Sequence, residues 1–158
     1  MKKLFSLSIY LWVLSAAMPA FSQAAKRAQQ FNLTKSSLAI DGYDPVSYFS
    51  SGKALEGKKD ITHTYEGVVY RFSSLQNKQA FLADPARYEP QYGGWCAYAM
   101  GASGEKVEVD PETFKIIDGK LYLFYNSFFN NTLKSWNKNE PALKTKADSN
   151  WKQFFNIK

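Results

Sequence analysis

The segment FKIIDGKLYLFY, residues 114–125, decides the class of fold that this chain can adopt. β-branched and aromatic residues lie on both sides of Asp118-Gly119, a pair that is typical of a two-residue type I′ turn between antiparallel strands. The segment therefore predicts a β-hairpin with strands over 114–117 and 120–125, and with Gly119 at positive φ. The same pattern occurs upstream, where the runs 61–65 and 68–72 flank Glu66-Gly67 and predict another hairpin.

Capping residues predict short helices before, between and after the two hairpins. The predicted helices cover residues 45–50, 74–83, 127–136 and 141–155, and a further turn is predicted over 85–88. Because strands and helices occur in separate groups without a repeated βαβ unit, the expected fold class is α+β. We expect a small single domain, with two antiparallel β-hairpins packed against short helices. The sequence shows no internal repeat and no low-complexity tract.

The first two dozen residues have the order of a secretory signal peptide. Lys2 and Lys3 precede an apolar run over 4–17, and small residues follow Pro19. That run is too short to span a bilayer, and no other stretch is apolar enough. We expect a signal peptide over 1–24, with cleavage after Ser22 as the alternative, a polar linker over 25–40 and a domain over 41–158. The expected location is periplasmic or secreted.

The distribution of charge argues against a nucleic-acid-binding protein, and the cysteine content excludes a protein that is stabilised by internal disulfides. Lys and Arg number 20 against 14 Asp and Glu, which gives a net charge of +6. The lysines are scattered and accompany no nucleic-acid-binding motif, so a nucleic-acid partner is not expected. Cys96 is the only cysteine, and the chain therefore forms no internal disulfide. Three alternatives remain for its free thiol: it is buried and inert, it binds a ligand, or it pairs with another chain.

Several segments resemble the YHS-domain family. They are GYDPV (42–46), the hairpin segment 65–74, FLADPARY (81–88), PQYGGWCAYA (90–99) and DGKLYL (118–123). The last two are similar to an exported, single-domain branch of that family. The resemblance covers most of the mature chain, and it implies the family's fold rather than a defined activity.

The resemblance also implies a metal site in part of the family, and this chain departs from it. Metal-associated members carry three cysteines where this chain has Ser47, Ser73 and Asn77. Hydroxyl and amide groups bind soft metals poorly, so the family's cysteine cluster is absent. A separate candidate remains, since sulfur and imidazole ligands suit copper or another soft metal. Its ligands would be Cys96, Met100 one helical turn later, and His63.

Three functional classes follow from these residues. The first is a non-enzymatic binding module with a metal or small-molecule site near Cys96, in which aromatic side chains line the pocket: Tyr43, Tyr92, Trp95 and Tyr98. The second is a protein-interaction or structural domain with a buried thiol. The third is an enzyme with Cys96 and His63 as nucleophile and base, oriented by Asp44 or Asp118. The usual catalytic motifs are absent, so we do not expect an enzyme. The partner is a small molecule, a metal or a protein whose identity the sequence does not give.

Overall fold

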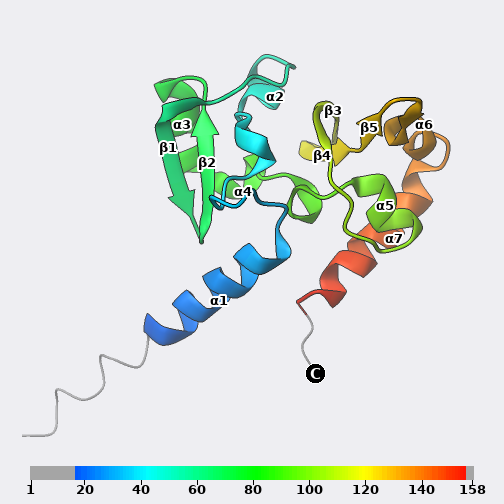
Figure 1. Ribbon diagram of the computed structural model, residues 1–158, viewed down its shortest axis with the longest axis horizontal. Coiled ribbons are helices and arrows are strands. Elements are labelled where there is room, and N and C mark those ends of the chain that lie inside the picture. The colour runs from blue at the N-terminus through cyan, green and yellow to red at the C-terminus, as the bar shows by residue number, and fades with distance from the viewer. Residues whose placement is uncertain (1–16, 156–158) are drawn as a thin grey trace, which may run out of the picture.

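The computed structural model describes residues 17–155, with side chains from Gln23 onward. Its helices and strands occur in separate groups, and its strands form three two-stranded antiparallel sheets (Figure 1). The α+β class is therefore confirmed. The elements in chain order are α1 (Ala17–Gln30), η1 (Ile40–Gly42), α2 (Ser47–Ser50), β1 (Lys58–Tyr65), β2 (Val68–Phe72), α3 (Leu75–Ala83), α4 (Pro85–Tyr88), η2 (Gln91–Gly94), α5 (Ala97–Ala102), β3 (Asp110–Ile117), β4 (Lys120–Phe124), β5 (Asn126–Ser127), β6 (Asn130–Asn131), α6 (Thr132–Trp136) and α7 (Glu140–Gln153).

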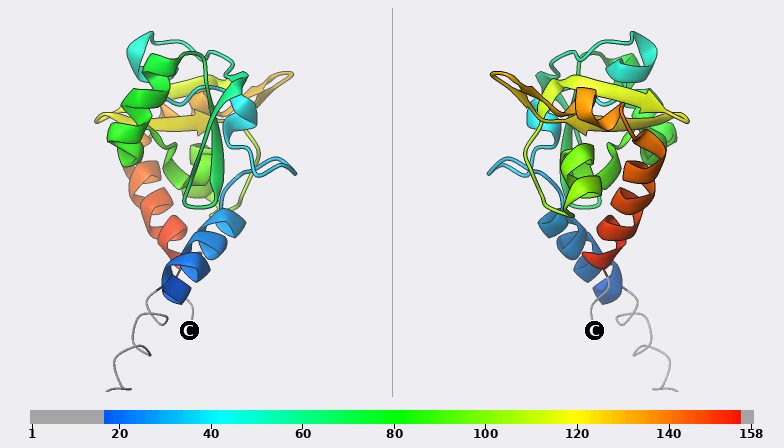
Figure 2. Two further views of the ribbon diagram at one scale, coloured as in Figure 1. Left: turned by 90° about the vertical axis from the view of Figure 1, so that its left-hand side faces the viewer. Right: turned by 90° about the vertical axis from the view of Figure 1, so that its right-hand side faces the viewer.

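The elements form two lobes that lie side by side in Figure 1. The first lobe, residues 38–88, contains the β1–β2 hairpin with α2, α3 and α4. The second lobe, residues 90–154, contains the β3–β4 hairpin with α5, α6 and α7. Helices α1 and α7 converge below the two lobes, as both views of Figure 2 show.

The two long hairpins have the same construction, at a spacing of 52 residues. In the first, Tyr65 pairs with Val68, and the register slips between Lys58 and Thr62. In the second, Ile117 pairs with Lys120, and the register slips between Asp110 and Phe114. Both turns hold two successive residues at positive φ, as a type I′ turn requires. Gly119, at φ 71°, confirms the predicted turn.

The same spacing relates the loops and hydrogen bonds of the two lobes. Isolated parallel bridges join Leu38 to Val69 in one lobe and Pro90 to Leu121 in the other. Six pairs of positive-φ residues are 52 positions apart: 40/92, 41/93, 42/94, 52/104, 66/118 and 67/119. We conclude that the second lobe repeats the backbone of the first.

The expectation that the chain has no internal repeat was therefore wrong. The repeat resides in backbone geometry, and the identical residue pairs in its loops and hairpins are few: 42/94, 51/103, 52/104, 56/108, 67/119, 70/122 and 72/124. Most of these are turn glycines or hairpin aromatics. Such residues are common to many hairpins, so they do not reveal a duplication when the sequence is read by itself.

The hydrophobic core has two clusters, and strand β4 contributes to both. Leu121 and Leu123 belong to the cluster of the first lobe, which surrounds Tyr70 and Phe81. Tyr122 and Phe124 belong to the second cluster, around Trp136. Successive side chains of a strand point to opposite faces, so β4 contributes alternate residues to each cluster. The strand therefore lies between the two clusters and supplies two leucines to the cluster of the first lobe.

The segment expected as a linker over 25–40 is ordered. Helix α1 continues to Gln30, and Leu33 then bridges Ala39. Phe31 packs against Trp151 of α7, with 6.1 Å between ring centroids. The polar composition of this segment suggested a linker, but its few apolar residues dock on the domain. Residues 1–16 of the expected signal peptide lie outside the described residues.

Three further sequence predictions differ from the structure. The predicted helix over 127–136 is a short hairpin, β5–β6, followed by helix α6 with Asn131 as N-cap. Helix α2 begins at Ser47, two residues later than predicted. Strand β1 begins at Lys58, three residues before the predicted strand over 61–65. In the first case Asn126 lies in the short hairpin instead of capping a helix, and Phe128-Phe129 form its turn.

Candidate functional site

Asp44 is a fully buried carboxylate at the centre of the first lobe. Its Oδ2 accepts hydrogen bonds from the backbone N–H and hydroxyl of Ser73, at 2.8 and 2.6 Å, and from the amide of Asn77 at 2.6 Å. Its Oδ1 accepts from the backbone N–H of Val46. The carboxylate thereby ties the loop before α2 to the end of β2 and to α3. These four donors compensate the cost of burying it.

Cys96 occupies the position of Asp44 in the second lobe. The backbone N–H of Asp44 donates to Leu55 at 2.8 Å, and that of Cys96 donates to Val107 at 2.9 Å, 52 positions later. Likewise the N–H of Ser73 donates to Asp44, and the N–H of Tyr125 donates to Cys96 Sγ at 3.4 Å. Cys96 is thus the hub that joins the loop before α5 to the end of β4.

The hydrogen-bond pattern assigns the proton on the Cys96 thiol. Thr132 Oγ1 lies 3.4 Å from Cys96 Sγ and 2.8 Å from the carbonyl oxygen of Tyr125. The single hydroxyl proton of Thr132 is donated to that carbonyl, which can only accept. The thiol therefore donates to Thr132 and accepts from Tyr125. The Cys96 thiol therefore has one hydrogen-bond partner as a donor and another as an acceptor.

A cleft of about 480 Å³ opens beside Cys96. Its walls come from α5, from the loop that follows it, and from the segment after β4. Most of its lining is apolar, and the polar groups lie at Asn130, Thr132 and Glu105. The residues that surround it are Cys96, Tyr98, Ala99, Ala102, Ser103, Glu105, Val107, Tyr125, Asn130 and Thr132.

Asp44 and Cys96 are the hubs of the two lobes, because each accepts the hydrogen bonds that join its loop to the end of a strand. The surroundings of the two hubs differ because the second lobe contains an insertion. In the first lobe, Ser73 and Ser74 lead directly into α3, and Asn77 of this helix reaches Asp44. In the second lobe, the β5–β6 hairpin separates Tyr125 from the N-cap of α6, and the insertion delays the helix by five residues. The cleft lies at this insertion, and Asn130 of β6 forms part of its wall.

Of the four aromatic residues predicted to line a pocket, the structure places only Tyr98 in the cleft. Tyr43 donates to Glu112 at 3.2 Å, and Trp95 donates to the carbonyl oxygen of Gln30 at 2.7 Å. Tyr92 is buried and donates to Asp148 at 2.9 Å, and burial raises its pKa well above the ordinary value. These three rings serve packing between elements.

The three predicted metal ligands are distributed over both lobes. Met100 is buried among Tyr92, Tyr122 and Trp136 in the second core. His63 lies on β1, opposite Tyr70 in the first lobe, and does not line the cleft. Within residues 17–155, no group of three or more His, Cys, Asp or Glu side chains could hold a metal ion. The donor set therefore does not fit a metal centre, although metal binding at Cys96 itself stays a prediction.

The residues weighed for catalysis are also separated. Asp44 is the buried hub of the first lobe, and Asp118 is an exposed turn residue paired with Lys144 at 3.2 Å. Cys96 has Thr132 and Tyr125 as its hydrogen-bonding partners. The described contacts thus place no histidine or carboxylate within hydrogen-bonding distance of the thiol, as a cysteine nucleophile with a base would need.

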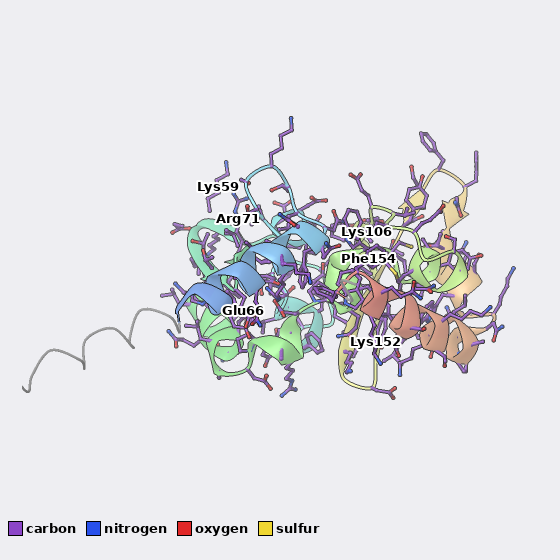
Figure 3. The ribbon with its side chains drawn as sticks, turned by 90° about the horizontal axis from the view of Figure 1, so that it is seen from below. Lys59, Glu66, Arg71, Lys106, Lys152 and Phe154 are labelled. Carbon is purple, nitrogen blue, oxygen red and sulfur yellow. The ribbon has the colours of Figure 1, made fainter. Side chains whose placement is uncertain are left out.

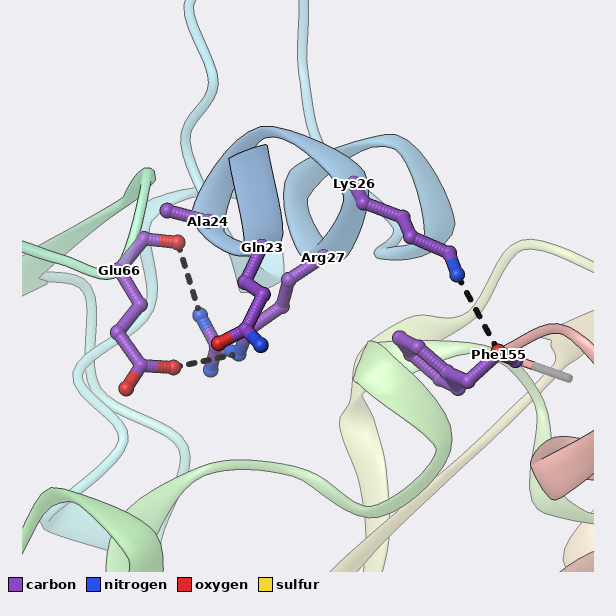
Figure 4. Close-up of a pocket in the computed structure, with 6 residues that line it drawn as sticks. All are labelled: Gln23, Ala24, Lys26, Arg27, Glu66 and Phe155. Atoms are coloured by element: carbon purple, nitrogen blue, oxygen red, sulfur yellow. Dashed lines mark hydrogen bonds and ion pairs between the residues drawn. The ribbon is translucent and has the colours of Figure 1, made fainter. Parts of the chain in front are cut away.

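A second hollow, of about 420 Å³, lies between α1, the β1–β2 turn and the end of α7 (Figure 4). Arg27 fills its inner side, where its guanidinium pairs with Glu66 and Glu89 and donates to two carbonyl oxygens of the turn. Lys26 donates to the carbonyl oxygen of Phe155 at 3.2 Å. Since the Arg27 guanidinium is ion-paired and the Lys26 ammonium is hydrogen-bonded to Phe155, this hollow is the junction that holds α1 against both lobes.

Lys106 forms a comparable junction on the second lobe. Its ammonium lies 4.4 Å from the ring centroid of Phe154, and Figure 3 shows the two side chains together. It donates to Gln30 at the end of α1 at 2.7 Å. Desolvation by the surrounding rings lowers the pKa of Lys106 from its ordinary value. Like Arg27, it connects α1 to the domain.

Comparison of the chain with protein-family models, with curated proteins and with solved structures found no match. The function must therefore be argued from the cleft and its surroundings. Among the described residues, no helix is both long and apolar enough to cross a membrane.

Proposed function

We propose that the chain is an exported, non-enzymatic binding module of the YHS type, which binds a small, mostly apolar molecule in the cleft beside Cys96. The YHS assignment rests on the sequence segments quoted above, and export rests on the N-terminal pattern. The single observation that supports the binding site is the contrast between equivalent positions in the two lobes. Ser73 and Asn77 occupy the hydrogen-bonding positions around Asp44, and the hollow beside them, lined by Val46 and Ser50, has only about 190 Å³ against about 480 Å³ in the second lobe. The hub at Cys96 adjoins an open cleft.

The composition of the cleft indicates the chemistry of its ligand. The side chains of Tyr98, Val107 and Tyr125 offer apolar and aromatic surface, while Asn130 offers an amide. Pockets of this size and composition commonly take small organic molecules, with a few polar groups that fix orientation. In this proposal the Cys96 thiol forms part of the cleft floor, and it supports the wall through Thr132 rather than acting as a nucleophile.

Native mass spectrometry of protein purified from its own compartment tests the proposal directly, together with metal analysis and an absorbance spectrum. We expect a bound organic molecule that Ala102→Phe excludes, because Ala102 is exposed on the cleft wall and a larger side chain there fills the space. The matched control is Ser50→Phe at the equivalent position of the first lobe, which should leave binding unchanged. A ligand that survives Ala102→Phe would contradict the site.

The Cys96→Ser variant and a thiol reagent separate this proposal from metal binding. We expect the thiol of the native protein to react slowly, because its side chain is buried. We also expect added Cu(I) to leave that rate unchanged. Protection of the native thiol by Cu(I), together with Cu(I) binding that Cys96→Ser loses, would replace the small-molecule proposal with a copper site.

A further inference from the structure

The β5–β6 hairpin presents two phenylalanines that contribute nothing to either core. Phe128 and Phe129 form the two-residue turn of the hairpin, and their relative exposures are 99% and 107%. Large apolar residues at full exposure, side by side, are unusual on a monomeric surface. The neighbours of this pair are all polar: Asn126, Ser127, Asn130 and Asn131. The apolar surface is thus confined to the tip.

The backbone at this tip is also unfavourable for the residue that it carries. Phe128 has φ 53°, in the left-handed region where a bulky side chain is strained and where Gly or Asn is usual. The turn would form more readily without the phenylalanine. A strained residue that adds no packing points to a role outside the fold.

The hairpin is held rigidly at its base. Asn126 donates to Thr113 Oγ1 at 3.0 Å and to Asp110 at 3.3 Å, while Asn131 accepts from the backbone N–H of Leu133 at 3.1 Å as the N-cap of α6. The first lobe has no counterpart of this hairpin, since Ser74 caps α3 directly after Ser73. The tip is therefore an added projection beside the cleft, hydrogen-bonded to the domain at its base.

The charge around the projection favours an anionic surface. Residues 126–138 contain Lys134 and Lys138, both exposed, and no Asp or Glu. Two carboxylates lie near the base: Asp110 is engaged by Asn126 and Thr113, and Glu105 on the cleft wall accepts from Ser103 at 3.1 Å. A second copy of the chain is disfavoured because each mature copy, without Lys2 and Lys3, still has 18 Lys and Arg against 14 Asp and Glu. Aromatic side chains on a basic surface are typical of segments that lie in the interface of anionic membranes.

We propose that Phe128 and Phe129 insert into the head-group region of an anionic phospholipid bilayer, and that Lys134 and Lys138 contact its lipid phosphates. Binding is reversible, because two side chains bury much less apolar surface than a lipid anchor. The contact places the Cys96 cleft, whose wall includes Asn130, next to the bilayer. The proposal rests on the tip and the two lysines, and it stands whether or not the cleft binds a ligand.

Flotation of the purified protein with vesicles tests this contact. The vesicles are phosphatidylcholine with or without about one quarter phosphatidylglycerol, at low and at physiological salt. We expect binding to the anionic vesicles, weaker at the higher salt. Phe128→Gly combined with Phe129→Ser should reduce the partition coefficient by about tenfold for each ring removed. Because glycine relieves the positive φ, this variant should fold at least as well as the native chain.

Two further variants complete the test. Leu75→Ser removes a leucine that is 67% exposed on the first lobe, and it should leave vesicle binding unchanged. Lys134→Gln with Lys138→Gln should weaken binding to anionic vesicles only. The proposal is overturned if the native protein fails to float with anionic vesicles, or if the double phenylalanine variant floats as well as the native protein. Self-association that this variant abolishes, without vesicle binding, would assign the tip to a second copy instead.

Discussion

Strands β2 and β4 occupy equivalent positions in the two hairpins, yet they are buried differently. In β2, alternate residues are buried, and Arg71 lies on the other, partly exposed face. In β4 the equivalent of Arg71 is Leu123, and every residue from Leu121 to Phe124 is buried. The same backbone thus serves as a half-covered strand in one lobe and as the partition between two cores in the other. Side-chain identity, rather than hairpin geometry, decides whether the strand is covered on one face or on both.

The largest effect is expected at alkaline pH, which tests whether the two cores unfold together. Burial raises the pKa of Tyr48 and Tyr70 in the first lobe, and of Tyr92 and Tyr122 in the second, above the ordinary value of 10.0. These raised values add stability that is fully present below the ordinary pKa and is lost as pH rises above it. We expect one cooperative alkaline transition, seen together in tyrosinate absorbance and circular dichroism. Two separate transitions would show that the lobes are independent.

Replacing the two hub residues compares them directly. Asp44→Ala removes the acceptor of four hydrogen bonds at a fully buried position, and should lower the free energy of unfolding by about 3 kcal/mol. Cys96→Ala leaves the N–H of Tyr125 and the hydroxyl of Thr132 with one partner fewer, and should cost about 1–2 kcal/mol. Urea denaturation of both variants measures the difference. Equal losses would mean that the hubs do not differ as their hydrogen bonds suggest.

Gly101 marks a second difference between the lobes. Its equivalent in the first lobe is Phe49, which packs against Tyr88 of α4 at 5.4 Å between ring centroids. A Cβ at Gly101 would lie 2.5 Å from the carbonyl oxygen of Leu143, because α7 crosses α5 closely there. Gly101→Ala should therefore destabilise the protein by about 1–3 kcal/mol. The exposed neighbour offers the control Ala102→Ser, which should leave the melting temperature within error.

The smallest expected effect is a difference in stability between alanine variants of the two turn glycines, Gly67 and Gly119. A Cβ at Gly119 would have no heavy atom within 4 Å, so Gly119→Ala should cost only the strain of positive φ, about 1 kcal/mol. At Gly67 the same Cβ would lie 3.1 Å from the carbonyl oxygen of Ala24 in α1. Gly67→Ala should therefore cost more in the chain that retains Ala24. If cleavage removes Ala24, as the signal-peptide pattern predicts, the two variants should become equal.

The sequence predicted the local structure better than the site. Both long hairpins, the cap at Ser74 and the turn at Gly119 follow from short-range chemistry that neighbouring residues determine. The partners of Tyr43, Tyr92 and Trp95 depend on segments up to 69 positions away, which no local pattern encodes. The Phe128-Phe129 turn was missed because a bulky residue at positive φ runs against the preferences on which turn prediction depends.

The sharing of β4 between two cores also makes the two lobes depend on each other. A single lobe of roughly 50 residues buries little of its surface, and it would be marginal without a partner. Here Leu121 and Leu123 of one copy complete the core of the other. A chain cut between the lobes would therefore leave the first cluster without Leu121 and Leu123, and we expect neither piece to fold by itself.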